Sequence, residues 1–300
     1  MPNISVIVAT RNRRSSLDQF LKLVRGFDTE PSWELIVVDN GSSDGTDKLL
    51  RATSGDLPMR VFEERQPGKS RALNQGLGHA RGDILLFADD DILPEQQWLK
   101  ELHRAAINYP GANVFGGRIL IDPRTTPNWV MDSYNLKSIL TSEQDFGEEI
   151  QWFGVARYPV GPNLAVRRRA MENRRFEWPV NLGPGTRLPL GDERAFLMQF
   201  SLPEQRDRLY VPASVVRHTL AGREINITNA LTRCFLGGYA AGIIDRHYGR
   251  VTWESNAEIA ALAWRRYQNS ASKNETICSA VRAFGVVLGR VSPFTRIDCR

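Results

Sequence analysis

Short apolar runs alternate with amphipathic stretches over the first third of the chain, and this rhythm constrains the fold more than any other feature. Continuously apolar runs such as ISVIVA and ELIVV are typical of strands that are buried on both faces. The runs predict strands at residues 4–9, 34–38, 60–63 and 83–88. Helical patterns lie between and after them, at residues 17–24, 44–52, 70–80 and beyond Pro94. A strand–helix alternation of this kind predicts the α/β class, with parallel βαβ units covered by helices on both faces of the sheet.

The rhythm changes after about residue 113. The second part of the chain predicts a longer strand at 113–121, an irregular segment with several prolines at 122–162, helices near 166–173 and 192–200, and a strand near 209–211. From residue 227 onward apolar residues recur at helical spacing, including Leu231 and Phe235 and then Ile259 and Leu262. We therefore expect a mostly helical C-terminal region.

Composition excludes several classes of protein. A net charge of +5 over 300 residues is mildly basic, well below the excess expected of a dedicated nucleic-acid binder. It suits ligands that carry phosphate, or an anionic membrane surface. Three isolated cysteines suggest neither a zinc site nor a disulfide framework and fit a reducing compartment. The N-terminus does not resemble a signal peptide and no apolar run is long enough to span a bilayer. We expect a cytoplasmic protein, with peripheral contact at the inner face of the plasma membrane left open.

Polar residues follow the predicted strands at the point where each one ends. Thr10, Arg11 and Asn12 follow the first strand, and Asp39 follows the second. Ligands of open parallel sheets bind beyond the carboxyl ends of the strands. Because these two strands should be neighbours, we expect Thr10 and Asp39 to share one crevice.

Three adjacent aspartates follow the fourth strand. Asp89, Asp90 and Asp91 repel one another unless a cation or solvent compensates their charge. Carboxylate oxygens are the ligands that Mg2+ and Mn2+ prefer, and substrate phosphates usually complete the coordination of these ions. In an extended segment Asp89 and Asp91 point the same way and can share a metal, while Asp90 faces elsewhere. A solvated acidic loop is the alternative, but the position directly after an apolar strand favours a metal site.

Six segments, taken in order, resemble the family 2 glycosyltransferases with the GT-A fold. They are VIVATRNR (6–13), ELIVVDNGSSDGT (34–46), QPGKSRALNQGL (66–77), GDILLFADDDILP (82–94), GPNLAVRRRAM (161–171) and GPGT…LGDERAFL (183–197). The resemblance implies a GT-A domain whose residues 1–115 bind a nucleotide sugar and whose residues 116–222 bind the acceptor. Residues 223–300 would form a helical extension.

The resemblance also implies roles for residues in the first half. Thr10, together with Arg11 and Asn12, would line the nucleotide pocket, and Asp39 would accept a hydrogen bond from the base, usually uracil. Lys69, Arg71 and Asn74 lie in the segment that closes over the base and ribose. Asp89 and Asp91 would form the DxD element that holds Mn2+ or Mg2+ on the diphosphate, and Asp90 would contact the ribose. The residues that the resemblance implies for the donor site are therefore Thr10, Arg11, Asn12, Asp39, Lys69, Arg71, Asn74, Asp89, Asp90 and Asp91.

The second half would supply the acceptor site and the catalytic base. The family usually shows Gly-Glu-Asp with the Asp as base, whereas this chain has Gly191-Asp192-Glu193. Alignment favours Glu193, but Asp192 is chemically nearly equivalent because a carboxylate needs only to reach the acceptor hydroxyl. His218 would be a third metal ligand or would contact the diphosphate, and Gly161 and Asn163 match an acceptor-side turn. We expect part of segment 122–160 to cover the acceptor.

The resulting expectation is an inverting, metal-dependent transfer of a sugar from a nucleoside-diphosphate donor, with UDP favoured, to a saccharide, lipid-linked or other acceptor. No nucleic-acid partner is expected, and a homodimer remains open. A sugar nucleotidyltransferase is the first alternative, but it usually carries a glycine-rich basic loop after the first strand, where this chain has Ala9-Thr10-Arg11-Asn12. A non-catalytic protein that binds nucleotide sugars is the second, supported by the atypical order of Asp192 and Glu193.

Overall fold

The structure is a computed structural model that describes residues 1–124, 126–154, 157–172, 176–200, 207–219, 225–249, 273–293 and 297–298. The helical pattern predicted around Ile259 and Leu262 lies outside these residues, as does Cys299.

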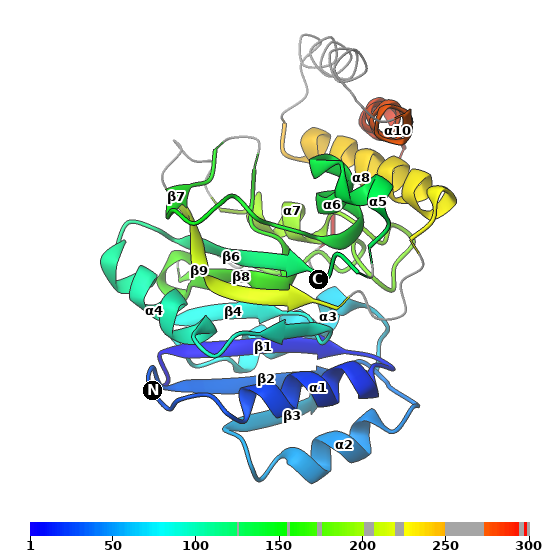
Figure 1. Cartoon of the computed structure of the whole chain (residues 1–300). Helices are drawn as coiled ribbons and strands as arrows, with labels where there is room; N and C mark the ends of the chain where they lie inside the picture. Colours follow the sequence, from blue (N-terminus) through cyan, green and yellow to red (C-terminus); the bar gives the residue numbers. More distant parts are fainter. Residues whose placement is uncertain are drawn as a thin grey trace.

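One mixed sheet forms the centre of the molecule (Figure 1). Its strands are β1 (Ile4–Thr10), β2 (Trp33–Asp39), β3 (Met59–Glu63), β4 (Ile84–Ala88), β5 (Ile92–Pro94), β6 (Val114–Ile121), β7 (Gln151–Trp152), β8 (Leu164–Arg167) and β9 (Arg208–His218). The strand order is β3-β2-β1-β4-β8-β6-β9-β5, and β7 pairs with β9. The first four strands are mutually parallel, whereas β8 is antiparallel to both of its neighbours. The predicted parallel βαβ half is therefore confirmed.

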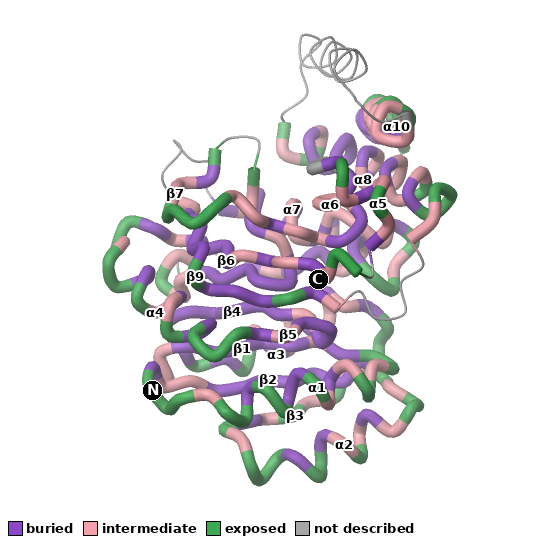
Figure 2. The backbone as a smooth tube through the Cα atoms, viewed as in Figure 1, coloured by how far each residue is buried: buried purple, intermediate pink, exposed green. Residues whose placement is uncertain are grey.

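Helices cover both faces of this sheet. They are α1 (Arg14–Val24), α2 (Thr46–Thr53), α3 (Lys69–His79), α4 (Trp98–Asn108), α5 (Asn128–Met131), α6 (Tyr134–Thr141), α7 (Asp192–Leu197), α8 (Ile227–His247) and α10 (Lys273–Val291). Alternate strand residues point to opposite faces. Val6 and Val37 therefore pack with α1 and α4, and Ile7 and Ile36 pack with α3 on the other side. Figure 2 shows the resulting band of buried residues along the strands.

Two expectations for the second half were wrong. The helix predicted near residues 166–173 is instead strand β8, followed by a short 3-10 turn at Arg168–Met171. Val166 and Ala165 lie between β4 and β6, and pairing on both sides overrides the local helical pattern. The segment predicted to be irregular contains α5 and α6, and α6 is capped by Ser133, whose hydroxyl accepts a hydrogen bond from the Leu136 amide at 3.2 Å.

The C-terminal helices α8 and α10 pack closely against each other at one end of the sheet (Figure 1). Glycines make this approach possible. A Cβ atom added to Gly238 or Gly242 would lie 2.1 Å from a backbone oxygen of α10, and one added to Gly289 would lie 2.1 Å from the Tyr239 carbonyl oxygen. The expectation of a mostly helical C-terminal region is confirmed for the residues described.

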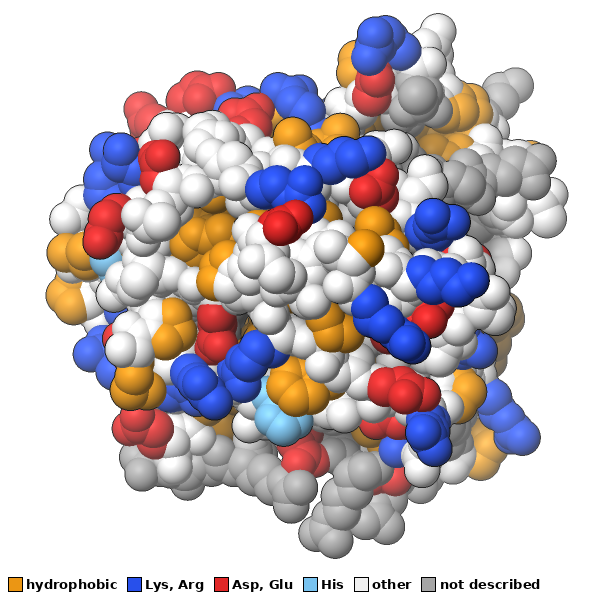
Figure 3. All heavy atoms as spheres, turned by 90° about the horizontal axis from the view of Figure 1, so that it is seen from below, with side chains coloured by type: hydrophobic (Ala, Val, Ile, Leu, Met, Phe, Trp, Pro, Cys, Tyr) orange, Lys and Arg blue, Asp and Glu red, His pale blue; other side chains and the backbone are white. Residues whose placement is uncertain are grey.

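Among the described residues, no helix combines the length and apolar character needed to cross a membrane. On the face shown in Figure 3, basic and acidic side chains are interspersed, and hydrophobic side chains are scattered among them.

Candidate active site

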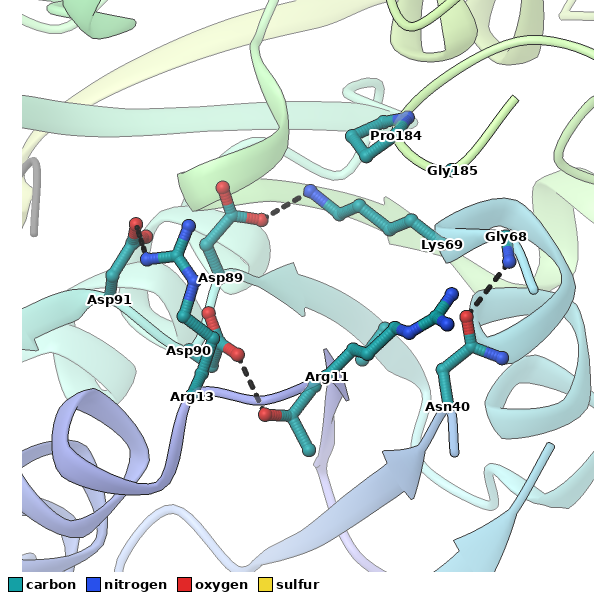
Figure 4. A pocket seen from close by; sticks show the side chains of 12 residues that line it. Arg11, Arg13, Asn40, Gly68, Lys69, Asp89, Asp90, Asp91, Pro184 and Gly185 are labelled. Carbon is teal, nitrogen blue, oxygen red and sulfur yellow. Dashed lines mark hydrogen bonds and ion pairs between the residues drawn. The ribbon is translucent and has the colours of Figure 1, made fainter. Parts of the chain in front are cut away.

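The carboxyl ends of β1, β2 and β4 meet at one edge of the sheet. Thr10 lies opposite Asp39 in the β1–β2 ladder, and β4 flanks β1 on its other side. Beyond these ends is a cavity of about 210 Å³ (Figure 4). Its lining comprises Ala9, Thr10, Arg11, Arg13, Asn40, Gly68, Lys69, Asp89, Asp90, Asp91, Pro184 and Gly185. The topology therefore brings together the motifs that follow the first and fourth strands.

The three aspartates of this cavity have three different partners. Asp89 pairs with the ammonium group of Lys69, and Asp91 pairs with Arg13 at 3.0 Å. Asp90 instead accepts a hydrogen bond from the Thr10 hydroxyl at 2.7 Å. Burial raises the pKa of Asp90 to about 7, the bond from Thr10 opposes this rise, and the neighbouring carboxylates add to it. As predicted, Asp90 points away from its two neighbours (Figure 4).

His218 reaches this acidic cluster through the sheet. Strand β9 ends beside β5, where His218 lies opposite Ile92, and the Thr219 amide donates to the Asp91 carbonyl oxygen at 3.0 Å. The ring Nδ1 lies 2.7 Å from the Thr141 carbonyl oxygen, and Nε2 lies 2.9 Å from Oδ1 of Asp91. Because a carbonyl oxygen only accepts, Nδ1 carries the hydrogen, and in the neutral ring the Nε2 lone pair faces Asp91.

The residues present fit a divalent metal ion. Asp89, Asp91 and His218 each offer one ligand atom, and these atoms lie within 4.8 Å of one another. A metal-bound histidine usually donates its other ring nitrogen to a carbonyl or carboxylate, which is the arrangement of Nδ1 on Thr141. Two carboxylates and one imidazole suit Mn2+ or Mg2+ completed by phosphate oxygens. The cluster can therefore hold a metal.

The second carboxylate pair lies at the start of α7. Asp192 is buried, with 2% of its surface exposed, and a Cβ on Gly183 would lie 2.6 Å from its carboxyl group. Glu193 instead extends over Gly161, where an added Cβ would lie 2.7 Å from Oε1 of Glu193. Burial, reinforced by the neighbouring Glu193 carboxylate, raises the pKa of Asp192 well above its usual value, although Lys69 opposes the rise.

Lys69 connects the two groups of carboxylates. Burial alone would lower the pKa of its ammonium group, but the carboxylates of Asp89, Glu193 and Asp192 outweigh burial and raise it. The Lys69 backbone amide donates to the Pro184 carbonyl oxygen at 3.0 Å, so the loop before α7 is joined directly to the start of α3. Lys69 therefore links the residues that follow β4 to those at the start of α7.

Glu193 lines a second, larger cavity of about 620 Å³. Residues of α6, of the segment after α6, of α8 and of α10 form its walls, while Glu193 lines it from α7. Asp192 lines neither cavity. Residues of segment 122–160, between Leu136 and Val160, line this space.

Several predicted residues lie outside both cavity linings and make structural contacts. Asp39 accepts from the Ser42 amide at 3.0 Å, and Asn12 accepts from the Ser43 amide at 2.7 Å, so both order the loops at the rim. The Asn74 side chain is bonded to both backbone groups of Trp178.

Arg71 and Asn163 also lie outside both cavity linings. The Arg71 amide donates to the Gly68 carbonyl oxygen at 3.1 Å. Asn163 is buried, accepts from Trp98 Nε1 at 2.9 Å and donates to the Ser214 carbonyl oxygen at 2.9 Å. Its amide group fills the space beside Gly117 that a Cβ would need. Asn163 therefore secures the irregularity between β6 and β9, while Gly161 faces Glu193.

The smaller cavity is also lined by Arg13, Asn40 and the Pro184–Gly185 loop, for which no role was predicted from the sequence. Asn40 accepts from the Gly68 amide at 2.8 Å and donates to the carbonyl oxygens of Glu64 and Gln66, which fixes the loop before α3. These residues could have been predicted, because they lie inside the six segments that resemble the family, close to residues that were predicted to belong to the site.

Comparison with known sequences identifies the family. The profile of "Glycosyl transferase family 2" matches residues 5–175, more than half of the chain. This chain belongs to that family.

Individual relatives match a shorter stretch. The glycosyltransferase AglE of Haloferax volcanii is 36% identical over 123 residues, which are 40% of this chain and 40% of that protein. A GalNAc(5)-diNAcBac-PP-undecaprenol beta-1,3-glucosyltransferase of Campylobacter jejuni is 32% identical over 123 residues, or 40% of this chain and 39% of that protein. The chain thus matches less than half the length of these relatives.

Solved structures extend the likeness over nearly the whole fold. The mannosyltransferase PcManGT of Pyrobaculum calidifontis, in complex with GDP-Man and Mn2+, gives a TM-score of 0.63 at 19% identity and covers 97% of this chain and 87% of its own. TarS 1-349 of S. aureus, in complex with UDP-GlcNAc, gives a TM-score of 0.54 at 16% identity, with 97% and 91% covered. The expected GT-A fold with a helical C-terminal part is confirmed.

Proposed function

We propose that this family 2 protein transfers a sugar from a nucleoside-diphosphate donor, UDP in the first instance, to a hydroxyl of a saccharide or lipid-linked acceptor. The observation that carries the proposal is the meeting of Asp89 and Asp91 with Lys69 and Arg13 in one cavity at the strand ends, with His218 buried behind the two aspartates and within ligand distance of them. This arrangement offers ligands to a divalent ion and cations to a diphosphate within the same small space.

On the donor side, the residues bind and orient the diphosphate. A divalent ion held by Asp89, Asp91 and His218 would neutralise charge on the diphosphate and so favour its departure. Lys69, Arg11 and Arg13 surround the same space and can donate to phosphate oxygens. Asp39 at the rim would accept the imide N–H of uracil, which is the basis for proposing UDP.

On the acceptor side, Glu193 takes the proton. The acceptor hydroxyl attacks the anomeric carbon, the bond from that carbon to the diphosphate oxygen breaks, and the hydroxyl proton passes to Glu193. A single displacement of this kind inverts the anomeric configuration. Glu193 is proposed over Asp192 because Glu193 lines the larger cavity, whereas Asp192 is buried against Gly183 and its raised pKa favours the protonated form.

Calorimetry with UDP and Mn2+ tests the donor site. We expect the wild-type protein to bind UDP only when Mn2+ is present, and Asp91→Ala to weaken binding and lower transfer about a thousandfold, since a metal ion supplies several kcal/mol of charge stabilisation. Asp47→Ala, at a half-exposed aspartate of α2 that pairs with Arg51, is the matched control and should bind like the wild type.

The outcomes separate the alternatives. A wild-type protein that binds no nucleoside diphosphate with Mn2+ contradicts the proposal, and GDP tested in parallel decides the base. Binding without transfer to any acceptor would favour the non-catalytic alternative. A retained anomeric configuration in the product would contradict the single displacement. Cytoplasmic location, peripheral membrane contact and a homodimer stay predictions.

A further inference from the structure

Helix α10 contributes a wall of the larger cavity through Cys278, Ser279 and Arg282. Arg282 lies one helical turn after Cys278 and Ser279, and residues of α6 and α8 line the same cavity, as does Glu193 from α7. Apolar side chains such as Ile139 and Leu190 complete the lining. The space beside the proposed base is therefore partly apolar and partly cationic.

Two charged groups of this cavity have opposite charges beside them. Arg194 pairs with Asp245, and Glu143 pairs with Lys137 at 2.9 Å. Arg282 differs from them, because within the described parts of the chain no carboxylate pairs with its guanidinium group. An anionic ligand would give this half-buried cation a charged partner.

The position of Arg282 is fixed by glycines of α8. A Cβ atom added to Gly237 would lie 3.1 Å from Nη1 of Arg282. A Cβ atom added to Gly238 would lie 2.1 Å from the carbonyl oxygen of Arg282. Gly237 also lines the cavity. The absence of two side chains on α8 thus lets the guanidinium group lie against that helix at the cavity wall.

A neighbouring guanidinium group comes from α8 itself. Arg233 lines the same cavity and donates to the Ile139 carbonyl oxygen at 3.3 Å from its Nη2 atom. Two guanidinium groups on adjacent helices are typical of sites that recognise phosphate, because each presents a planar fork of donors.

We propose that Arg282 binds a phosphate group carried by the acceptor, so that the hydroxyl to be glycosylated lies near Glu193. The inference rests on the proposed function, since it names the chemical class of the acceptor for the same site. The phosphate can belong to a lipid headgroup or to a phosphorylated sugar, and the apolar part of the lining accommodates either an alkyl chain or a sugar face.

Binding measured without metal or donor tests this directly. The full chain in EDTA is titrated by calorimetry with octyl phosphate, below its micelle concentration, and with glucose 1-phosphate. Octyl glucoside and glucose serve as the neutral counterparts. We expect at least one phosphate probe to bind and its neutral counterpart to bind at least tenfold more weakly. The probe that binds more tightly distinguishes a lipid headgroup from a phosphorylated sugar.

Variants locate the bound phosphate. Arg282→Gln should weaken phosphate binding at least about tenfold, as expected for loss of a hydrogen bond to a charged group. Arg282→Lys should lie between that variant and the wild type. Ser279→Glu adds a negative charge to the same wall and should weaken binding without removing Arg282. Arg51→Gln, at an exposed arginine of α2, is the matched control and should change nothing.

Two results would overturn the proposal. One is the failure of both phosphate probes to bind the wild-type protein more tightly than their neutral counterparts. The other is binding that survives Arg282→Gln and Ser279→Glu but is lost in Lys69→Gln, which would place the phosphate in the smaller cavity. Neither result affects the Mn2+-dependent UDP binding that tests the proposed function, so the two proposals fail separately.

Discussion

The two cavities of this protein are built in different ways. The smaller one lies at the ends of parallel strands, and most of its lining comes from residues at the ends of β1, β2 and β4 or directly after them. The larger one is enclosed by α6, α8 and α10 together with the segment after α6, so helices supply much of its lining.

This difference indicates how each site can vary. Strand ends are held in register by the sheet, so the residues after them converge whatever the helices do. A cavity between helices depends on how those helices pack, and a change far along the chain can reshape it. We expect donor binding and acceptor binding to respond separately to substitutions.

The largest effect is expected at Glu193. The variant Glu193→Gln should have a kcat about 100- to 10,000-fold lower than the wild type, because the acceptor proton then has no base to receive it. The Kd for UDP with Mn2+ should stay unchanged, because this side chain lines only the larger cavity. Steady-state kinetics and calorimetry measure the two quantities.

Asp192→Asn is the matched control for that variant. Asn has nearly the shape of a protonated Asp, the form that burial favours at this position, so kcat should fall much less. A larger loss in Asp192→Asn than in Glu193→Gln would reverse the assignment of the base. A parallel loss of UDP binding would show that the two cavities are not separable.

A smaller effect, on stability, is expected where α8 meets α10. In Gly289→Ala the new Cβ would lie 2.1 Å from the Tyr239 carbonyl oxygen, so the helices must separate. Overpacking of this kind should lower the free energy of unfolding by about 1–3 kcal/mol. Phosphate binding should weaken as the wall moves, while UDP binding stays intact.

Gly78→Ala is the corresponding change in the donor half. Gly78 lies in α3, and nothing lies within 4 Å of an added Cβ there. The variant should be stabilised by roughly 0.5–1 kcal/mol, because alanine favours a helix over glycine. Thermal unfolding compares both variants, and equal stability changes would contradict the close approach of α8 and α10.

The smallest effect is expected at Glu34, on β2. Burial pushes the pKa of its carboxyl group up, but hydrogen bonds from Ser5, the Arg81 amide and Arg60 outweigh burial and lower the pKa overall. A group with a lowered folded-state pKa stabilises the fold above its unfolded pKa and loses that contribution as the pH falls through the folded-state value.

Glu34→Gln should therefore lower the free energy of unfolding by about 1 kcal/mol at pH 7 and by less near pH 4. Thermal unfolding at both pH values measures the difference. An equal loss at the two pH values would show that the carboxylate charge is not what stabilises this edge of the sheet.

The donor half was largely predictable from the sequence, for a physical reason. The apolar runs fix which residues form parallel strands, and parallel strands place their ends together, so Thr10 and Asp39 were expected to share one crevice. Thr10 lines the cavity together with the three aspartates, whereas Asp39 lies outside its lining. His218 is 127 positions from Asp91 and came from the family resemblance alone. The structure supplies the mechanism that joins them, the pairing of β9 with β5.

The residues that were not predictable are those whose role depends on a distant partner. Asn163 and Asn74 carry amide groups suited to a ligand, yet these groups bond to Ser214 and to Trp178. Nothing near Asn163 in the sequence indicates that Trp98 and a sheet irregularity need its side chain. A helix was likewise predicted from residue 166 onward, because β4 and β6, which enclose Val166, lie elsewhere in the chain.

The glycine contacts between α8 and α10 restrict how substrate preference can change during evolution. Because backbone meets backbone at Gly238, Gly242 and Gly289, no layer of side chains exists there that could be exchanged to shift the wall gradually. New acceptor preferences would arise on the side of α10 that carries Ser279 and Arg282, where substitutions leave the helix pair unchanged. This short stretch is where sequences that share the donor half should diverge in what they glycosylate.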